Sequence, residues 1–357
     1  MVSERTGRNT IQLALALLLL SWQGGCRPAE PEPDPPAEPT VIADPVGSDA
    51  EISKPDKLDD AAVSDEQVQI PPPVDVPIQP APQPPPKPEP VDPTKLDRPL
   101  YPLSVAATPT GTLYVADHHL PGIWQVEDGR MSLFFLGEKK FRTPLNAIRC
   151  VAIDGEGRVL AGDSATGDVY RFDQQGQPES MTGRDRPLGV ITLPYSIAID
   201  GRGDLLVTDQ GEGDQRIARI PAEGGTVELV AEVFTPRGLD VDSEQNVWVI
   251  SQRRLLRLSP DGDRETIVDD GVFEFPHAVV VRDDGVAFVS DGYARTIWKI
   301  EPGQSPQAWV RDEPLKNPVG MALWQDRLVV ADPHARALFA IDWDGNVSPV
   351  ELQPAGD

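Results

Sequence analysis

One pattern recurs six times between residues 101 and 352, at spacings of 40 to 46 residues. Each copy contains a short apolar run that ends in a polar residue. These runs are LYVAD (113–117), VLAGD (159–163), LLVTD (205–209), VWVIS (247–251), AFVSD (287–291) and LVVAD (328–332). Self-similarity at this period is typical of folds built from stacked or radially arranged repeats, in which each unit buries its apolar face against the next.

Each copy contains enough apolar runs for four strands. A proline lies 14 or 15 residues before the final polar residue in five copies, and Ile148 takes its position in the second. Turn signals such as DGEG (154–157), DGRG (200–203) and WDGN (343–346) separate the runs. Short β-rich runs bounded by such turns indicate antiparallel meanders. We therefore predict an all-β, six-bladed β-propeller of four-stranded antiparallel blades over residues 99–357, almost without helix. No spare strand precedes Tyr101, so we expect blade one to close against blade six by packing.

The first strand of each copy has a regular register. The second residue after the proline position is always small, and the third is always large and apolar. The small residues are Ser104, Cys150, Ser196, Gly238, Ala278 and Gly320, and the large ones are Val105, Val151, Ile197, Leu239, Val279 and Met321. Neighbouring positions of a strand face opposite ways. We expect small residues where inner strands crowd together and large residues between blades, so Cys150 is predicted to be a packing residue.

The N-terminus has the features of an export signal. Arg5 and Arg8 precede an apolar run over 11–20, which is too short to span a membrane. Cys26 follows two glycines in a manner that resembles the bacterial lipobox, in which the cysteine is lipidated. We predict a signal peptide with a lipobox over residues 1–26, and ordinary secretion with an incidental cysteine is the alternative.

Residues 27–98 are rich in proline and acidic side chains and have no aromatic residue. Such a segment buries no core, so we predict a disordered, Pro-rich acidic linker that acts as a tether. A ligand for a proline-recognising module is the alternative. The chain has a formal net charge of −25, most of it in residues 99–357. A phosphate backbone would be repelled, so nucleic acid is not expected as a partner.

A candidate binding site follows from the propeller geometry. The residue after the proline position is expected at the mouth of the central channel, and it differs from blade to blade. These residues are Leu103, Arg149, Tyr195, Arg237, His277 and Val319. Variable polar residues at one structural position are typical of a site added to a fold. Arg149 and Arg237 suit an anionic ligand, Tyr195 can stack on a ring, and His277 is expected to become charged below about pH 6.5.

Further polar residues are expected on the same face. Five repeats end their second strand in aspartate: Asp117, Asp163, Asp209, Asp291 and Asp332. We interpret these as structural, because a carboxylate at a strand end can accept backbone N–H bonds. In the alternative, the arginines serve only to pair with these aspartates. His118, His119 and His334 follow this position in two blades, and His277 with His334 is the better pair for a metal.

Two units carry a family resemblance: PHAVVVRDDGVAFVSDGYARTIWKIEPG (276–303) and PVGMALWQDRLVVADPHARALFAID (318–342). They resemble NHL repeats, whose pattern is a proline, a small-apolar strand, an Asp-Gly turn, a strand ending in Asp, and a basic-apolar strand. All six units match in part, over about 250 residues. Blade four departs most, because Ser251 replaces the aspartate. The resemblance implies a propeller that serves as a binding platform.

The strands are also similar, more distantly, to gluconolactonase and regucalcin-like propellers. That resemblance implies a divalent metal held over the channel by Glu, Asn and Asp. The candidate ligands here are Glu274, Asn317 and Asn146. None of them lies in a copy of that family's motifs.

These observations favour an exported, lipid-anchored binding module of the bacterial cell envelope, which contacts the membrane surface through its lipid. Its expected ligand is a small molecule, a glycan or a protein, held at the channel mouth by Arg149, Tyr195, Arg237, His277 and His334. We expect a monomer that needs no cofactor and is not an enzyme. A metal-dependent lactonase or related hydrolase, with a divalent metal, is one alternative. A structural envelope protein without a ligand is another.

Overall fold

The computed structural model describes residues 92–354, except 139, 141–142, 184–189, 212 and 214. The expected signal peptide, Cys26 and most of the linker lie outside the described residues. The only helix in this part of the chain is a 3-10 turn, η1 (Pro93–Lys95). Leu96 and Leu100 pack against the core of the first blade, so the packed part of the chain begins before residue 99. No helix of the described residues is long and apolar enough to cross a membrane.

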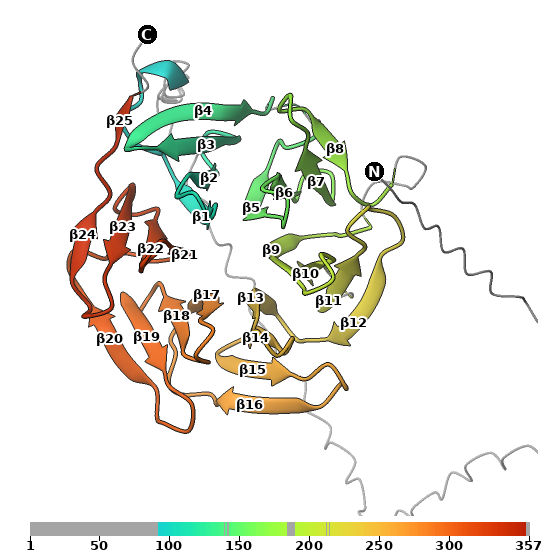
Figure 1. Cartoon of the computed structure of the whole chain (residues 1–357), viewed down its shortest axis with the longest axis vertical. Coiled ribbons are helices and arrows are strands. Elements are labelled where there is room, and N and C mark those ends of the chain that lie inside the picture. Colours follow the sequence, from blue (N-terminus) through green and yellow to red (C-terminus); the bar gives the residue numbers. More distant parts are fainter. Residues whose placement is uncertain are drawn as a thin grey trace, which may run out of the picture. The chain divides into compact units, whose positions relative to one another are not determined.

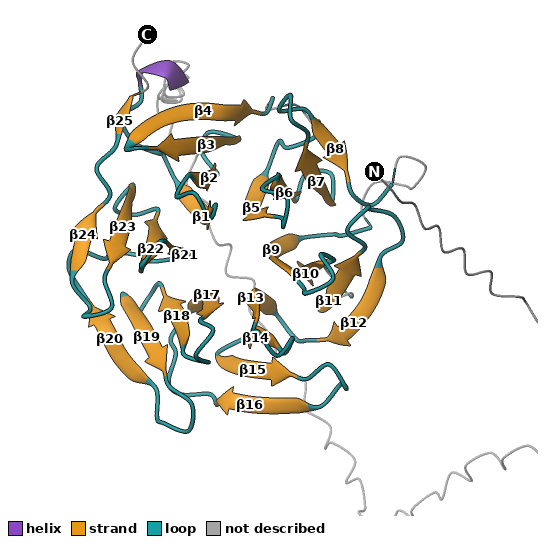
Figure 2. Cartoon of the chain, in the orientation of Figure 1, coloured by secondary structure: helices purple, strands orange, loops and turns teal. Residues whose placement is uncertain are grey.

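Six antiparallel sheets form a closed ring, as Figures 1 and 2 show. Blade one contains β1 (Pro102–Ala107), β2 (Leu113–Asp117), β3 (Gly122–Glu127) and β4 (Arg130–Leu136). Blade two contains β5 (Ile148–Ile153), β6 (Val159–Asp163), β7 (Asp168–Phe172) and β8 (Pro178–Ser180). Blade three contains β9 (Pro194–Ile199), β10 (Leu205–Gln210), β11 (Gln215–Ile220) and β12 (Glu228–Glu232).

The remaining blades repeat the same meander. Blade four contains β13 (Pro236–Val241), β14 (Val247–Ser251), β15 (Arg254–Leu258) and β16 (Arg264–Val268). Blade five contains β17 (Pro276–Val281), β18 (Ala287–Asp291), β19 (Thr296–Ile300) and β20 (Gln307–Arg311). Blade six contains β21 (Gly320–Trp324), β22 (Arg327–Asp332), β23 (Ala337–Ile341) and β24 (Val347–Pro349). The predicted six-bladed, all-β architecture is thereby confirmed.

The innermost strands β1, β5, β9, β13, β17 and β21 lie around the axis of the ring (Figure 1), and their residues line its central channel. Small residues let these strands approach one another. A Cβ atom added to Gly238 would lie 2.5 Å from the Cα of Ala278, and one added to Gly320 would lie 2.7 Å from the Cα of Ser104. Both contacts are shorter than real Cβ atoms make, so the small positions fit the crowding expected from the sequence.

The large apolar positions fill the space between blades. Val105 packs with residues of blade six, such as Val329 and Leu338. Val151 packs with Ala116 and Ile123 of blade one. Each interface buries mainly aliphatic side chains, and this apolar burial is the main source of stability for a ring without helices.

Ring closure differs from the expectation. A short strand near the C-terminus, β25 (Gln353–Pro354), pairs in parallel with β4 and makes blade one five-stranded. The N–H of Gln353 also donates to the carbonyl of Gly129 at 2.9 Å. Closure therefore combines packing with one added strand. The sequence did not predict the added strand, because a two-residue strand that contains proline has no sequence signal of its own.

Candidate binding site at the mouth of the channel

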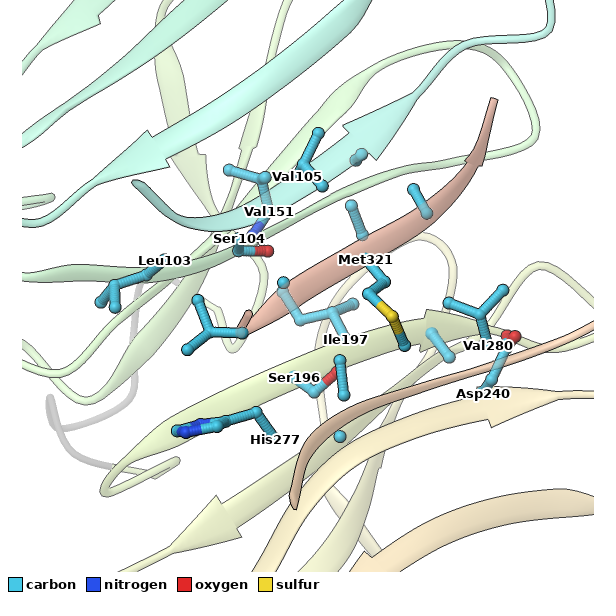
Figure 3. Close-up of a pocket in the computed structure, with 18 of the residues that line it drawn as sticks. Leu103, Ser104, Val105, Val151, Ser196, Ile197, Asp240, His277, Val280 and Met321 are labelled. Carbon is cyan, nitrogen blue, oxygen red and sulfur yellow. Dashed lines mark hydrogen bonds between the residues drawn. The ribbon is translucent and has the colours of Figure 1, made fainter. Parts of the chain in front are cut away.

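The inner strands enclose a cavity of about 820 Å³, the size of many small-molecule sites. Figure 3 shows its lining, with Leu103 and His277 toward one end and Asp240 and Val280 toward the other. The end near His277 is the mouth, because the inner strands begin there. Arg149 and Tyr195 also line the cavity, which places three of the predicted ligand-binding residues around one space.

The repeat aspartates form the frame of the mouth. Each is fully buried and accepts backbone N–H groups from the loop that leads into its own blade. Asp291, for example, accepts the N–H groups of Glu274 and Phe275 at 2.7 and 2.8 Å. Asp117 and Asp332 make the same kind of contact in blades one and six. Asp163 and Asp209 do so in blades two and three. These bonds fix the loop conformations, and none of the five aspartates lines the cavity.

Blade four uses a different bond. Ser251 occupies the aspartate position, and its hydroxyl donates to the carbonyl of Phe234 at 2.8 Å. Serine reverses the direction of the contact, since the loop supplies an acceptor where the other blades supply donors. The mouth is consequently poorer in negative charge beside blade four, which is the blade that carries Arg237.

Arg149 points toward the channel without a carboxylate partner among the described residues. Its only hydrogen bond there is a long one, 3.5 Å from Nε to the hydroxyl of Ser164. The alternative in which this arginine serves only to pair with a repeat aspartate is thus not what the structure shows. Its terminal guanidinium nitrogens keep their donors for other partners.

Arg237 has a different environment from the one expected. Its side chain lies 3.8 Å above the ring of Phe275, and its Nη1 donates to the carbonyl of Pro276 at 2.9 Å. It makes no ion pair with any described residue, and burial lowers its pKa. On Phe275 stacks Tyr293, at 4.6 Å between ring centroids, with 69% of its surface exposed. Arg237 therefore sits at the edge of an aromatic ledge and outside the channel lining.

Tyr195 and His277 bond to each other across the intervening blade four. The hydroxyl of Tyr195 lies 2.8 Å from Nδ1 of His277, and either group can be the donor. Burial, with the nearby charge of Arg237, lowers the pKa of His277 to about 4. Burial also raises the pKa of Tyr195, which keeps its proton. The expectation that His277 becomes charged near pH 6.5 is wrong, because its site is desolvated and already next to a cation.

The other three histidines gather around Tyr101 at blades one and six. His119 stacks on Tyr101 at 4.4 Å, and the rings of His118 and His334 lie 6.3 and 6.2 Å from it. His118 and His119 line the cavity, whereas His334 is exposed outside it. His277 and His334 thus belong to separate groups on the mouth face.

The residues suggested as metal ligands do not fit a metal. None of Glu274, Asn317 and Asn146 lines the channel. The amide of Asn146 donates to the carbonyl of Lys140, and Asn317 is buried with its Oδ1 against Gly292. No group of three or more His, Cys, Asp or Glu in the described residues could hold a metal ion. We derive no chemistry through a metal.

Cys150 has the packing role expected of it. It is 2% exposed, and burial raises the pKa of its thiol to about 12. A Cβ on Gly162 would lie 2.6 Å from its sulfur, so the thiol fills the space beside that glycine.

Sequence reasoning missed three residues of this region. Phe275 and Tyr293 form the ledge, and Asp240 lies inside the channel. A signal for Asp240 was available, because the matching residues of the other blades are apolar: Ala106, Ala152, Ala198, Val280 and Ala322. Phe275 precedes the repeat proline, where no shared pattern marks a functional residue.

Comparison with known proteins supports the fold. No protein-family model and no curated protein sequence matches the chain. Among solved structures, a gluconolactonase from Xanthomonas campestris is similar with a TM-score of 0.57 and 16% identity, over 71% of this chain and 87% of that one. Virginiamycin B lyase from Staphylococcus aureus is similar with a TM-score of 0.53 and 18% identity, over 72% and 85%.

A propeller in a nidogen/laminin complex is also similar, with a TM-score of 0.51 and 19% identity, over 62% of this chain and 86% of that one. All three are six-bladed propellers. Identity this low shows the shared fold alone, because one fold carries many unrelated activities.

Proposed function

We propose that the channel mouth binds a small organic anion that carries a flat ring, and that the protein is a binding module and not an enzyme. The observation that carries this proposal is Arg149, a cation of the channel lining without an acidic partner in the described residues. A guanidinium in that state favours a carboxylate or similar anion, which it can bind through two parallel hydrogen bonds.

The surroundings suit such a ligand. Tyr195 and His277 line the same cavity as Arg149, and so does the stacked pair Tyr101 and His119. Aromatic faces accept a flat ring. The net charge of −25 opposes the binding of an anion only weakly, because charges more than about 8–10 Å from the mouth are screened at physiological salt. A glycan acid or an acidic protein segment would satisfy the contact with the Arg149 guanidinium but would bring no flat ring for the aromatic faces.

The location of this activity is part of the proposal. The lipobox-like Cys26 would hold the module at a membrane surface of the cell envelope, and residues 27–98 would give it reach. Replacing Cys26 with serine is then expected to release the protein from the membrane fraction. Equal membrane association of this variant and the wild type would contradict an anchor at Cys26.

Anion binding at the mouth is tested with benzoate as the anionic probe and benzyl alcohol as its neutral counterpart. Benzoate is expected to raise the melting temperature of the wild-type chain, and benzyl alcohol is not. Arg149→Ala should weaken benzoate binding about 10- to 100-fold, the range of one charge-assisted hydrogen-bonding group. Arg149→Lys should retain part of the affinity.

Arg327→Ala is the matched control, since Arg327 lies in the β21–β22 hairpin at the opposite face, beside Asp326. It should leave benzoate binding unchanged. Equal weakening by Arg149→Ala and Arg327→Ala, or no effect of benzoate on the wild type, would count against the proposal. The second result would favour a structural protein without a small-molecule ligand.

A further inference from the structure

The channel holds one carboxylate well below the mouth. Asp240 lies near the end of β13 and is the only acidic residue among the described residues that line the cavity. Arg149 is three strand positions closer to the mouth in its own blade than the residue that matches Asp240. At about 3.3 Å per residue, the two levels are separated by about 10 Å along the channel.

The surroundings of Asp240 are apolar. The matching positions of the other five blades hold alanine or valine, and Val280 lies beside Asp240 in Figure 3. Ile153, Ile199 and Val281 continue the lining at this end of the cavity. The burial of Asp240 raises the pKa of its carboxyl to about 6, so the group is still ionised above neutral pH.

The carboxylate is held in place but is not neutralised. Its Oδ2 accepts the N–H of Val281 from blade five at 2.8 Å, and its Oδ1 accepts the N–H of Val241 at 2.8 Å. These two bonds use half of the acceptor capacity of a carboxylate. No lysine, arginine or histidine of the described chain forms an ion pair with it. Carboxylates that are largely removed from water are normally paired with a cation, and Asp240, which is partly buried, has none among the described residues.

We propose that this end of the channel binds an organic cation, a primary ammonium group on a slim apolar body, with Asp240 as its counter-ion. The ammonium would use the free lone pairs of the carboxylate, and the aliphatic lining would cover the body. A divalent metal ion is a poorer fit, because calcium and magnesium take six or more oxygen ligands and this level offers one carboxylate among aliphatic side chains. The proposal is independent of the anion site at the mouth.

The probe is n-hexylammonium chloride, measured by titration calorimetry on the full chain at pH 8, with 1-hexanol and hexanoate as partners of equal length. Hexylammonium is expected to bind one to one, and hexanol and hexanoate at least tenfold more weakly. Asp240→Asn keeps the shape and removes the charge, and it should weaken hexylammonium binding at least tenfold.

Two controls separate this site from its surroundings. Asp261→Asn makes the same change in charge at an exposed turn between β15 and β16, and it should leave binding unchanged. Asp326→Asn, at the exposed hairpin between β21 and β22, removes another carboxylate outside the cavity and should also leave hexylammonium binding unchanged.

Equal affinity of hexylammonium for the wild type and for Asp240→Asn would overturn the proposal. So would equal binding of hexanol and hexylammonium to the wild type, a comparison that holds even if the variant does not fold. Stabilisation by sodium or potassium chloride equal to that by hexylammonium would indicate an inorganic ion and would overturn it as well.

Discussion

Tyr195 and His277 belong to blades three and five, and their side chains meet at 2.8 Å over blade four. The bond is possible because Arg237, the residue of blade four at this level, turns toward Phe275 and away from the channel. It joins two blades that are not neighbours in the ring. At the mouth, Tyr195 and His277 thus bond to each other, whereas Arg149 of blade two has only its long bond to Ser164 among the described residues.

Arg237 is expected to control the ionisation of His277. Burial is the first cause of the lowered pKa of His277, and the positive charge of Arg237 is the second. Arg237→Gln removes that charge, so the pKa of His277 should rise from about 4 toward its ordinary value without reaching it. The measurement is an NMR titration of the His277 ring.

Arg327→Gln removes a charge at the opposite face and should leave the titration of His277 in place. An unchanged pKa of His277 in Arg237→Gln would show that burial alone lowers it. The same titration also tests whether the histidine stays neutral at pH 6, where the sequence alone suggested that it begins to gain charge.

Asp240 is expected to make the fold less stable as pH rises. The native pKa is about 6 and the ordinary value is 3.8, so the native state holds more protons than the unfolded state between about pH 4 and 6. Stability from this group is complete below about pH 4 and is lost as pH rises through 6. A pKa shift of one unit corresponds to about 1.4 kcal/mol, so the free energy of unfolding lost through Asp240 reaches roughly 2–3 kcal/mol.

Asp240→Asn should therefore gain free energy of unfolding relative to the wild type as pH rises from 4 to 7, measured by urea unfolding at each pH. The comparison with the wild type is needed because His277 acts in the opposite direction. Its lowered pKa makes the native state hold fewer protons than the unfolded state between about pH 4 and 6.5. Asp261→Asn is the control and should show a flat difference.

Position 291 of blade five should not tolerate serine, the residue that blade four has at the equivalent position. Asp291→Ser removes the acceptor for the N–H groups of Glu274, Phe275 and Ala294. Asp291 is fully buried and these three N–H donors are partly buried, so at about 1–2 kcal/mol for each unsatisfied donor we expect a total loss of roughly 3–6 kcal/mol in the free energy of unfolding. Urea unfolding measures it.

Ser251→Ala is the counterpart in blade four. It removes one donated bond to the carbonyl of Phe234, so a loss of about 1 kcal/mol is expected. A cost for Asp291→Ser no larger than that for Ser251→Ala would show that the aspartate bonds contribute little to stability.

The ring could be predicted from the sequence because the same local pattern occurs six times. The prolines at 102, 194, 236 and 276 begin β1, β9, β13 and β17, and the polar ends of the second runs lie in the second strands. The binding site was harder to predict from the sequence, because its geometry depends on the directions of side chains. The strand position of Arg237 is the same as that of Arg149, yet only Arg149 lines the channel. An aromatic neighbour, Phe275, decides that difference, and it comes from another blade.

The strand β25 is expected to contribute to closure of the ring. Truncation after Leu352 removes the pairing of Gln353 and Pro354 with β4, while Val350 and Leu352 remain packed on the core of blade one. Only a short length of strand is lost, so we expect the free energy of unfolding to fall by about 1 kcal/mol. This loss lowers the Tm by about 2–4 °C in a domain of this size. Truncation after Pro354 is the control, because it keeps β25 and removes only residues 355–357. If the two truncated chains melt at the same temperature, β25 contributes nothing measurable and the first and sixth blades close the ring by packing.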